Sequence, residues 1–248
     1  METININLKL PQAWTELSDH DLRFVFRLIA SDMTLDEIKT LCLFKWSGLK
    51  VEHRQDDGLF ACSHHKLKFL LTADQVTELL PFFAWLDEPS KVPVCLRKLR
   101  HRRPFAADFS DVPFEKFIVC DNLFQGYLST QNDEFLRQMA SVLYGHDFKR
   151  LDHEELISVF YWFVSVKDHM TALYPNFLQR ASADGNLLGE GAATPAQVRE
   201  SANAMLRALT KGDISKEAEI LAIDTHRALT ELDAQAKEYR ELNAKMKS

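Results

Sequence analysis

The order of hydrophobic and polar residues predicts helices along most of the chain, and the clearest of them is a central apolar run. Residues 156–166 (LISVFYWFVSV) contain nine apolar residues and two serines. A helix that is apolar on nearly every side has to be enclosed by other elements, and the charged residues that flank this run leave it too short to cross a membrane. Asp152 and Glu155 have the spacing of a capping box. We therefore predict a buried central helix with Asp152 as its N-cap.

Shorter amphipathic segments precede this run. Their apolar residues recur every three or four positions, and residues that favour N-caps, such as Ser18, Thr34 and Thr72, stand where three of them begin. Pro81 falls inside one segment and is expected to kink it or to end it early. The predicted helices are residues 19–29, 34–46, 72–86, 112–128 and 135–144.

Two stretches have the pattern of strands instead. Residues 4–10 alternate between apolar and polar side chains and stop before Pro11, which is typical of a short half-buried strand. Residues 49–71 contain two short runs on either side of the sequence DDG at 56–58, and Asp-Gly between strand-like runs favours a β-hairpin. Residues 66–71 are a candidate third strand.

The composition changes after the central helix. Residues 181–194 (ASADGNLLGEGAAT) contain three of the eight glycines and no periodic apolar face, so we predict a flexible linker. The sequence TPAQ at 194–197 has the pattern of an N-cap, a first-turn proline and a capping-box glutamine, and Asp213 is predicted to cap a long final helix. Residues 195–248 are therefore expected to form a helical hairpin.

These elements together predict a mainly α protein. Eight glycines and eight prolines against 17 phenylalanines in 248 residues favour helices packed through aromatic side chains. The predicted organisation is a helical domain, residues 1–180, around the central helix with a small β-hairpin near 49–71. The linker at 181–194 and the hairpin at 195–248 follow it.

The final helix carries a narrow apolar seam. The residues that recur at alternating intervals of four and three are Thr225, Leu229, Leu232, Ala236, Tyr239, Asn243 and Met246. Such a seam fits the side of another helix, and an asparagine within it is a device for fixing register in coiled coils. An ordinary helix that folds back on its own domain is the alternative. We predict a contact face for a protein partner or a second copy of the chain, made by Leu229, Leu232, Ala236 and Tyr239.

A dense group of positive charges lies at residues 97–103. It consists of Arg97, Lys98, Arg100, Arg102 and Arg103. Three interpretations stay open: a solvated loop or helix end, a contact with an acidic protein, and a contact with nucleic-acid phosphates. The net charge of −6 and the lack of interleaved aromatic residues, with only Phe105 nearby, disfavour the last of these.

The predicted hairpin also contains a weak candidate for a metal site. If residues 57 and 58 form a two-residue turn, His53 lies opposite Cys62, and His64 is two residues further along the same strand. The three side chains would then share one face and offer zinc-type ligands. Their spacing matches no standard zinc pattern, and a change of one residue in the turn would separate them, so ordinary hairpin histidines are the preferred interpretation.

The sequence does not indicate an enzyme. It contains no G-x-S-x-G, H-E-x-x-H or Walker A motif, and the glycines at 185, 189 and 191 do not follow a predicted strand. We predict no catalytic residues and no cofactor. A deep pocket enclosing two or more titratable side chains would revive an enzymatic function.

The cysteines and the first residues indicate where the protein works. Cys42, Cys62, Cys95 and Cys120 are widely separated, and no pair has C-x-x-C spacing. The start METININLKL has neither a basic segment nor an apolar segment of the kind found in signal peptides. We expect free thiols in a reducing setting, either cytoplasmic or virion-associated, and no membrane partner.

Four segments resemble an uncharacterised family of proteins encoded in prophage-like elements. The segments are LPQAWTELSDHDLRFVFRLIA (10–30), LFKWSGLKV (43–51), NAMLRALTKGD (203–213) and AIDTHRALTELDAQAKEY (222–239). The resemblance implies a role in virion morphogenesis, of the tail-assembly-chaperone or connector type, and assigns no functional residue. The leading hypothesis is thus a non-enzymatic assembly or structural protein of a phage-like particle. The alternative is a nucleic-acid-associated accessory protein that uses the basic cluster at 97–103.

Overall fold

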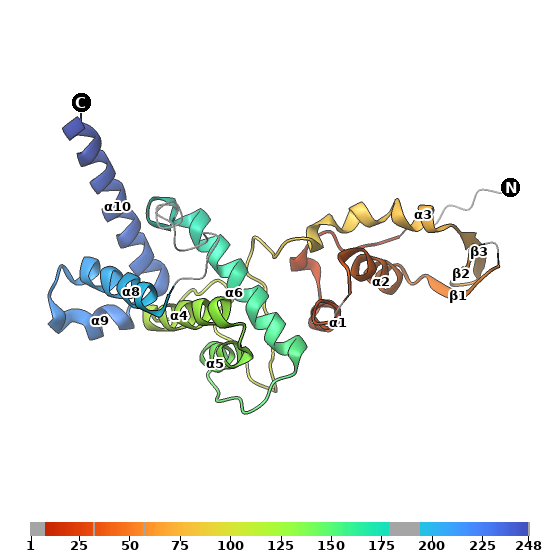
Figure 1. Ribbon diagram of the computed structural model, residues 1–248, viewed down its shortest axis with the longest axis horizontal. Helices are drawn as coiled ribbons and strands as arrows, with labels where there is room; N and C mark the ends of the chain where they lie inside the picture. Colours follow the sequence, from red (N-terminus) through yellow and green to blue (C-terminus); the bar gives the residue numbers. More distant parts are fainter. Residues whose placement is uncertain (1–7, 32, 57, 179–193, 248) are drawn as a thin grey trace. The chain divides into compact units, whose positions relative to one another are not determined.

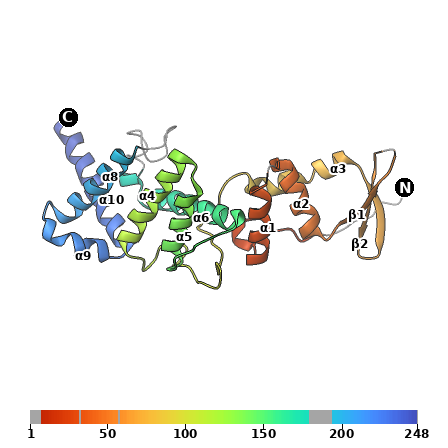
Figure 2. The same cartoon turned by 60° about the horizontal axis from the view of Figure 1, so that its bottom comes forward.

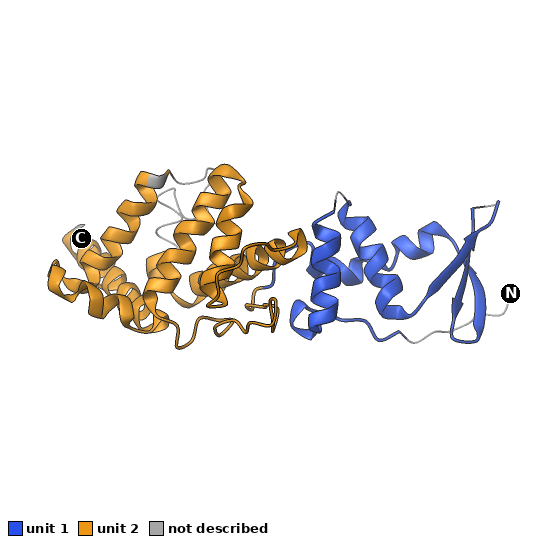
Figure 3. Ribbon diagram, turned by 90° about the horizontal axis from the view of Figure 1, so that it is seen from below, with its two compact units in different colours: residues 1–90 blue, residues 91–248 orange. Residues whose placement is uncertain are grey.

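The computed structural model describes residues 8–31, 33–56, 58–178 and 194–247. These residues are mainly helical, as predicted, and include one small antiparallel sheet. They form two compact units, called here unit 1 (residues 1–90) and unit 2 (residues 91–248), which Figure 3 shows in different colours. Within the described residues, no helix combines the length and the hydrophobicity that crossing a bilayer requires.

The boundary between the units differs from the predicted one. The sequence predicts a domain of residues 1–180 and a separate hairpin at 195–248, whereas the structure divides the chain after residue 90 and groups the C-terminal helices with the central helix. This grouping depends on contacts between helices that are far apart in the chain, which local composition does not encode. The predicted linker at 181–194 lies outside the described residues, except for Thr194.

Unit 1 begins with two helices whose ends follow the predicted capping signals. Its first elements are η1 (Trp14–Glu16), α1 (Asp19–Ile29) and α2 (Leu35–Ser47). Ser18 accepts a hydrogen bond from the backbone N–H of Asp21, and Thr34 and Glu37 make both bonds of a capping box. Gly48 ends α2 with φ 70°, a left-handed conformation that glycine adopts at little cost.

The last helical part of unit 1 is interrupted by a proline, as predicted. Thr72 and Gln75 form the expected capping box, but α3 (Ala73–Thr77) is short and gives way to η2 (Leu80–Leu86), which has Pro81 in its first turn. The indole N–H of Trp14 donates to the carbonyl oxygens of Trp85 and Glu88, each at 2.9 Å. These bonds tie the start of the unit to its end.

The sheet of unit 1 has three antiparallel strands in the order β1-β2-β3. They are β1 (Lys50–Arg54), β2 (Phe60–His64) and β3 (Leu67–Leu71). The predicted hairpin and third strand are therefore confirmed. The predicted strand at 4–10 is different: its residues 8–10 are described and are not in a strand, and residues 4–7 lie outside the described part of the chain.

Unit 2 is built around the predicted central helix. The helices α4 (Phe114–Thr130), α5 (Asp133–Leu143) and α6 (His153–Leu173) lie side by side in Figures 1 and 2. No side chain of residues 156–166 is exposed, so the prediction of a buried α6 is confirmed. The capping box of Asp152 and Glu155 is present, and α6 begins directly after Asp152.

Aromatic side chains fill the core of unit 2. Phe109 contacts Phe117, Trp162 and Phe163 with ring centroids 5.9 to 6.5 Å apart, and all four residues are buried. The indole N–H of Trp162 donates to the backbone carbonyl of Ala107 at 2.8 Å, so its polar atom is satisfied inside the core. The many phenylalanines of the sequence are used here to pack helices together.

The C-terminal region contains three helical pieces after α8, so the prediction of one long final helix that begins at Asp213 is wrong. α8 (Pro195–Thr210) begins with the predicted capping box of Thr194 and Gln197. Asp213 caps only the short turn η3 (Ile214–Lys216), which is followed by α9 (Glu217–Ala222) and α10 (Thr225–Lys247). The expected single helix breaks because Ile223 is extended and its carbonyl accepts a hydrogen bond from Phe114 at the start of α4.

Candidate functional site

The last helix, α10, is anchored firmly at its start. Thr225 is fully buried, and both its backbone N–H and its hydroxyl donate to the carbonyl oxygen of Val112, at 2.8 and 2.7 Å. The neighbouring bond from the N–H of Phe114 to the carbonyl of Ile223 is 2.8 Å long. These bonds fix the first turn of α10 against the first turn of α4.

A polar stripe then fastens α10 to the residues after α6. Its members, His226, Asp233 and Arg240, are seven residues apart and so share one face of the helix. The His226 ring lies 2.7 Å from the Tyr174 hydroxyl. One oxygen of Asp233 accepts from the backbone N–H of Asn176 at 2.7 Å and from that of the next residue, and Arg240 donates to the Asn176 carbonyl. The stripe therefore determines where α10 lies up to about its fourth turn.

The first half of the predicted seam is buried inside unit 2. Leu229 has 0% of its surface exposed and Leu232 has 3%, and Ala228 beside them is also buried. These two leucines therefore do not lie on an exposed contact face, which corrects the prediction for them. The reason is that α10 packs against α4 and α8, so the seam faces the unit's own helices at this point.

The second half of the seam is open to solvent. Tyr239, Leu242 and Met246 have 53%, 59% and 79% of their surface exposed. Ala236 and Asn243 are half-buried on the same part of the helix. In Figure 1 this end of α10 extends beyond α8, which contacts α10 in unit 2. The structure thus divides the predicted face of α10 into a buried first half and an exposed second half.

The basic cluster lies on a tight turn. Leu99 and Arg102 exchange two backbone hydrogen bonds of 2.9 and 2.8 Å, and the residues between them, Arg100 and His101, have φ values of 45° and 72°. Two consecutive left-handed residues are characteristic of the type I′ turn of a hairpin. Leu99 is fully buried and holds the turn to the unit.

The charges of this cluster do not all serve the same purpose. All five basic side chains are exposed, but Arg100 makes ion pairs with Asp152 at 2.7 Å and with Glu155 at 3.1 Å. Arg100 therefore ties the turn to the capping box of α6. Among the described residues, nothing makes a hydrogen bond or an ion pair with the side chains of Arg102 and Arg103. These two carry the charge that is available to an external anion.

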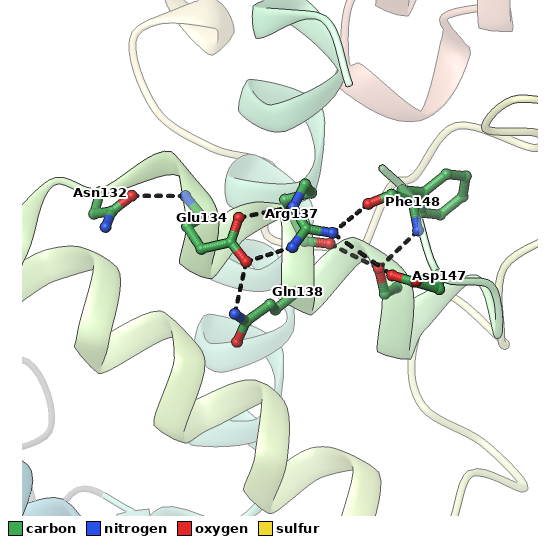
Figure 4. A network of polar contacts seen from close by, with 7 residues as sticks. Asn132, Glu134, Arg137, Gln138, Asp147 and Phe148 are labelled. Atoms are coloured by element: carbon green, nitrogen blue, oxygen red, sulfur yellow. Dashed lines mark hydrogen bonds and ion pairs between the residues drawn. The ribbon is translucent and has the colours of Figure 1, made fainter. Parts of the chain in front are cut away.

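A network around Arg137 fixes the loop between α5 and α6. Figure 4 shows its guanidinium between Glu134 on one side and Asp147 and the carbonyl of Phe148 on the other. Hydrogen bonding from Arg137 lowers the pKa of Glu134 to about 2. Asn132 caps the same helix by accepting from the N–H of Glu134 at 2.9 Å. Each partner is used within the fold, so the network has a structural role.

The candidate metal ligands are not brought together. His53 pairs with Ala61 across the sheet, and Cys62 pairs with Val51, with an irregularity of register between residues 51 and 53. The hairpin closes through a bond from the N–H of Gln55 to the carbonyl of residue 59, so its loop is one residue longer than a two-residue turn. His53 therefore points to the opposite face from Cys62 and His64. Within the described residues, no three potential ligands form a metal-binding group.

A polar cluster that the sequence did not predict lies inside unit 2. Lys167 Nζ lies 2.6 Å from Asp121 Oδ1, and the two side chains are only 4% and 12% exposed. Gln125, one turn after Asp121 on α4, is also buried. Asp121 interrupts the apolar stripe of its helix, which was the available signal. Lys167 stands at the end of the apolar run, where the sequence suggests a solvated flank.

Comparisons with known proteins do not connect the chain to a family. No protein-family model, curated protein or solved structure matches it. A function has therefore to be argued from the exposed end of α10, the basic turn and the buried polar cluster.

Proposed function

We propose that the protein is a non-enzymatic assembly protein that binds another helix through the exposed end of α10. The observation that carries this proposal is the exposure of Tyr239, Leu242 and Met246 within two turns of one helix. Large apolar side chains that gather on one exposed surface usually mark a contact with another molecule, because burying them removes apolar surface from water. The end of α10 is already helical, so a partner would meet a preformed surface.

The spacing of the seam favours a second copy of the chain as the partner. With Leu229 at heptad position a, Ala236 and Asn243 also fall at a, and Tyr239 and Met246 fall at d. An asparagine at an a position can pair with its own counterpart across a parallel two-stranded coiled coil. A parallel pair would place the two copies of Asn243 opposite each other and cover both copies of Tyr239.

The size of the surface indicates a weak contact. Residues 236–247 span about 18 Å of helix. A contact along so short a helix buries less surface area than a stable interface between two proteins does. Weak contacts suit a protein that works in an assembly, where several contacts act together. The setting we propose, a phage-like particle, is supported by the resemblance of the four segments to prophage-encoded proteins, with a tail-assembly-chaperone or connector type of role.

The mass of the full chain in solution tests this proposal. Sedimentation velocity should show a mass that rises with concentration from 28.6 kDa, the mass of one chain, toward a dimer. Replacing Tyr239, Leu242 and Met246 together by serine should leave a monomer at every concentration. Ile214→Ser is the matched control, because Ile214 is 78% exposed in the same unit but lies outside α10, and it should associate as the unmodified chain does. A chain that stays monomeric throughout would contradict the proposal.

A second candidate function is binding of nucleic-acid phosphates by the basic turn. The observation that favours it is the pair of exposed guanidinium groups on Arg102 and Arg103 at the end of a turn that two backbone hydrogen bonds close. Binding of a labelled single strand, followed by fluorescence anisotropy, should weaken steeply with salt. On a single strand each arginine that binds a phosphate contributes about 0.7 to the salt slope, so replacing both by glutamine should make the slope shallower, whereas Lys237→Gln should leave it unchanged. Binding that is unaffected by Arg102→Gln and Arg103→Gln would exclude the turn as the site.

A further inference from the structure

Helix α8 covers unit 2 without packing closely on it. No described side chain of α8 before Thr210 is buried, although the helix contacts α4 and α10. Two adjoining pockets lie between α8 and the helices beneath it, one of about 310 Å³ and one of about 200 Å³. Both pockets are partly open to solvent, so they differ from the deep enclosed pocket that would indicate an enzyme, and they are large enough to hold a small molecule.

The wall opposite α8 places polar groups between the two pockets. Asp121 lines both pockets, Lys167 lines the smaller one, and Gln125 lines the larger one. The Nε2 atom of Gln125 is buried and has no hydrogen-bond partner in the described residues. Asp121 uses Oδ1 for Lys167, and the ammonium of Lys167 can donate more than one hydrogen bond. The site thus offers donors and an acceptor that the fold itself does not fully use.

The smaller pocket supplies an apolar chamber beside these polar groups. Its walls include Phe117 from α4, Phe177 and Leu178 from the segment after α6, and Leu232 from α10. A molecule with a polar head at Asp121 and a short apolar body would place that body among these side chains. Small-molecule sites commonly have this form, a mainly apolar pocket with a few convergent polar groups.

The charges of the site determine which polar head group a bound molecule can have. Asp121 and Lys167 neutralise each other, and Glu200 adds a negative charge at the larger pocket. A carboxylate head would meet the carboxylates of Asp121 and Glu200. An amine head would meet the Lys167 ammonium and would leave Gln125 Nε2 without an acceptor. A carboxamide is uncharged and provides both an acceptor oxygen and N–H donors.

We propose that the pockets beneath α8 bind a small neutral molecule with a carboxamide head and an apolar body. Its carbonyl oxygen accepts from the donors of Lys167 and Gln125, its N–H donates to Asp121, and its body fills the smaller pocket. This site lies between α8 and the elements α4, α6 and the buried first half of α10, and it does not include the exposed end of α10. The proposal therefore does not rest on the pairing of α10.

Three probes with the same six-carbon chain test the head group. Hexanamide, hexanoate and hexylamine would each be titrated into the full ¹⁵N-labelled chain and followed by NMR. Hexanamide should shift the side-chain amide signals of Gln125 and the backbone signals of Ala204 and Met205, which line the pockets. The charged probes should bind at least about tenfold more weakly, because hexanoate meets the carboxylates of Asp121 and Glu200 and hexylamine leaves Gln125 Nε2 without an acceptor. Equal affinity for all three would overturn the carboxamide assignment.

Two variants test the location. Ala204 lines both pockets, so Ala204→Leu should fill them and abolish the hexanamide shifts, while the matched control Asn203→Leu, which changes the adjacent residue outside the pockets, should not. Gln125→Met removes the unpartnered donor at similar volume, so the melting temperature should rise and the preference for hexanamide should disappear. Unchanged hexanamide binding in both variants would overturn the site. Absence of any hexanamide shift in the unmodified chain would mean that the pockets hold only water.

Discussion

The two halves of α10 carry one heptad repeat but have different surroundings. Thr225, Leu229 and Leu232 in the first half are buried by the unit's own helices, whereas Tyr239 and Met246 in the second half are exposed. The repeat continues across both halves without a break in spacing. A heptad pattern therefore predicts which residues share a face of a helix, but not which element covers that face. The exposed second half of α10 is the surface that is left for a partner.

The largest expected effect is at the buried half. Leu229→Ala should lower the free energy of unfolding by about 2–5 kcal/mol, because it removes a fully buried side chain and leaves a cavity. Urea denaturation followed by circular dichroism measures this loss. A loss below about 1 kcal/mol would show that the first half of α10 does not pack into unit 2 as described.

A smaller effect is expected where the two halves meet. Asp233→Ala leaves the N–H of Asn176 and of the next residue without their acceptor, and should cost about 1–3 kcal/mol in unfolding free energy. Lys237→Ala, an exposed change one turn later, is the control and should cost little. If both variants lose the same amount, the polar stripe does not hold α10 in place.

Alkaline pH should lower the free energy of unfolding through Tyr174, which contacts the buried half of α10. Burial raises the pKa of the Tyr174 phenol, which contacts His226 at the base of α10, above its ordinary value of 10.0. Because the protonated phenol is favoured in the folded state, its contribution to stability is present below pH 10 and is lost as the pH rises through the raised pKa. Burial also raises the pKa of Tyr127 and Tyr161, so a variant without the Tyr174 hydroxyl is needed to separate its contribution from theirs.

The variant is Tyr174→Phe, measured by urea denaturation at several pH values above and below 10. The unmodified chain should lose more unfolding free energy across this range than Tyr174→Phe does. An identical loss in both chains would show that Tyr174 does not titrate in the way its surroundings imply.

The smallest effect on stability is expected at the exposed half. Tyr239→Ala should change the unfolding free energy of the monomer by no more than about 0.5 kcal/mol, because more than half of its side chain already meets solvent. Measured at low concentration, such a result separates this residue from Leu229, ten positions earlier on the same helix. A loss as large as that of Leu229→Ala would remove the distinction between the two halves.

Local signals in the sequence predicted the fold class and most helix starts. The capping boxes at Thr34, Thr72, Asp152 and Thr194 are all present, because each depends on residues only three positions apart. The burial of α6 was also predictable, since a helix without a polar face has to be enclosed. The exposure of the basic residues at 97–103 followed from their charge.

Features that depend on distant contacts were not predictable. The register of the hairpin changed with a single residue in its loop, which separated His53 from Cys62. The break between α9 and α10 depends on Ile223 bonding to Phe114, more than a hundred residues earlier. The pairing of Asp121 with Lys167 likewise requires two helices to meet, and only the polar interruption at Asp121 marked it in the sequence.

Disulfide cross-linking at the exposed half tests the central claim most directly. In a parallel pair of α10 helices the a positions face each other, so Asn243→Cys should form a disulfide-linked dimer on mild oxidation. Glu241→Cys, at heptad position f on the far side of the same turn, should stay monomeric under the same conditions. Strong cross-linking at 243 and little at 241 is the result we predict. Equal cross-linking at both positions, or none at 243, would contradict the pairing of α10 with a second copy of the chain.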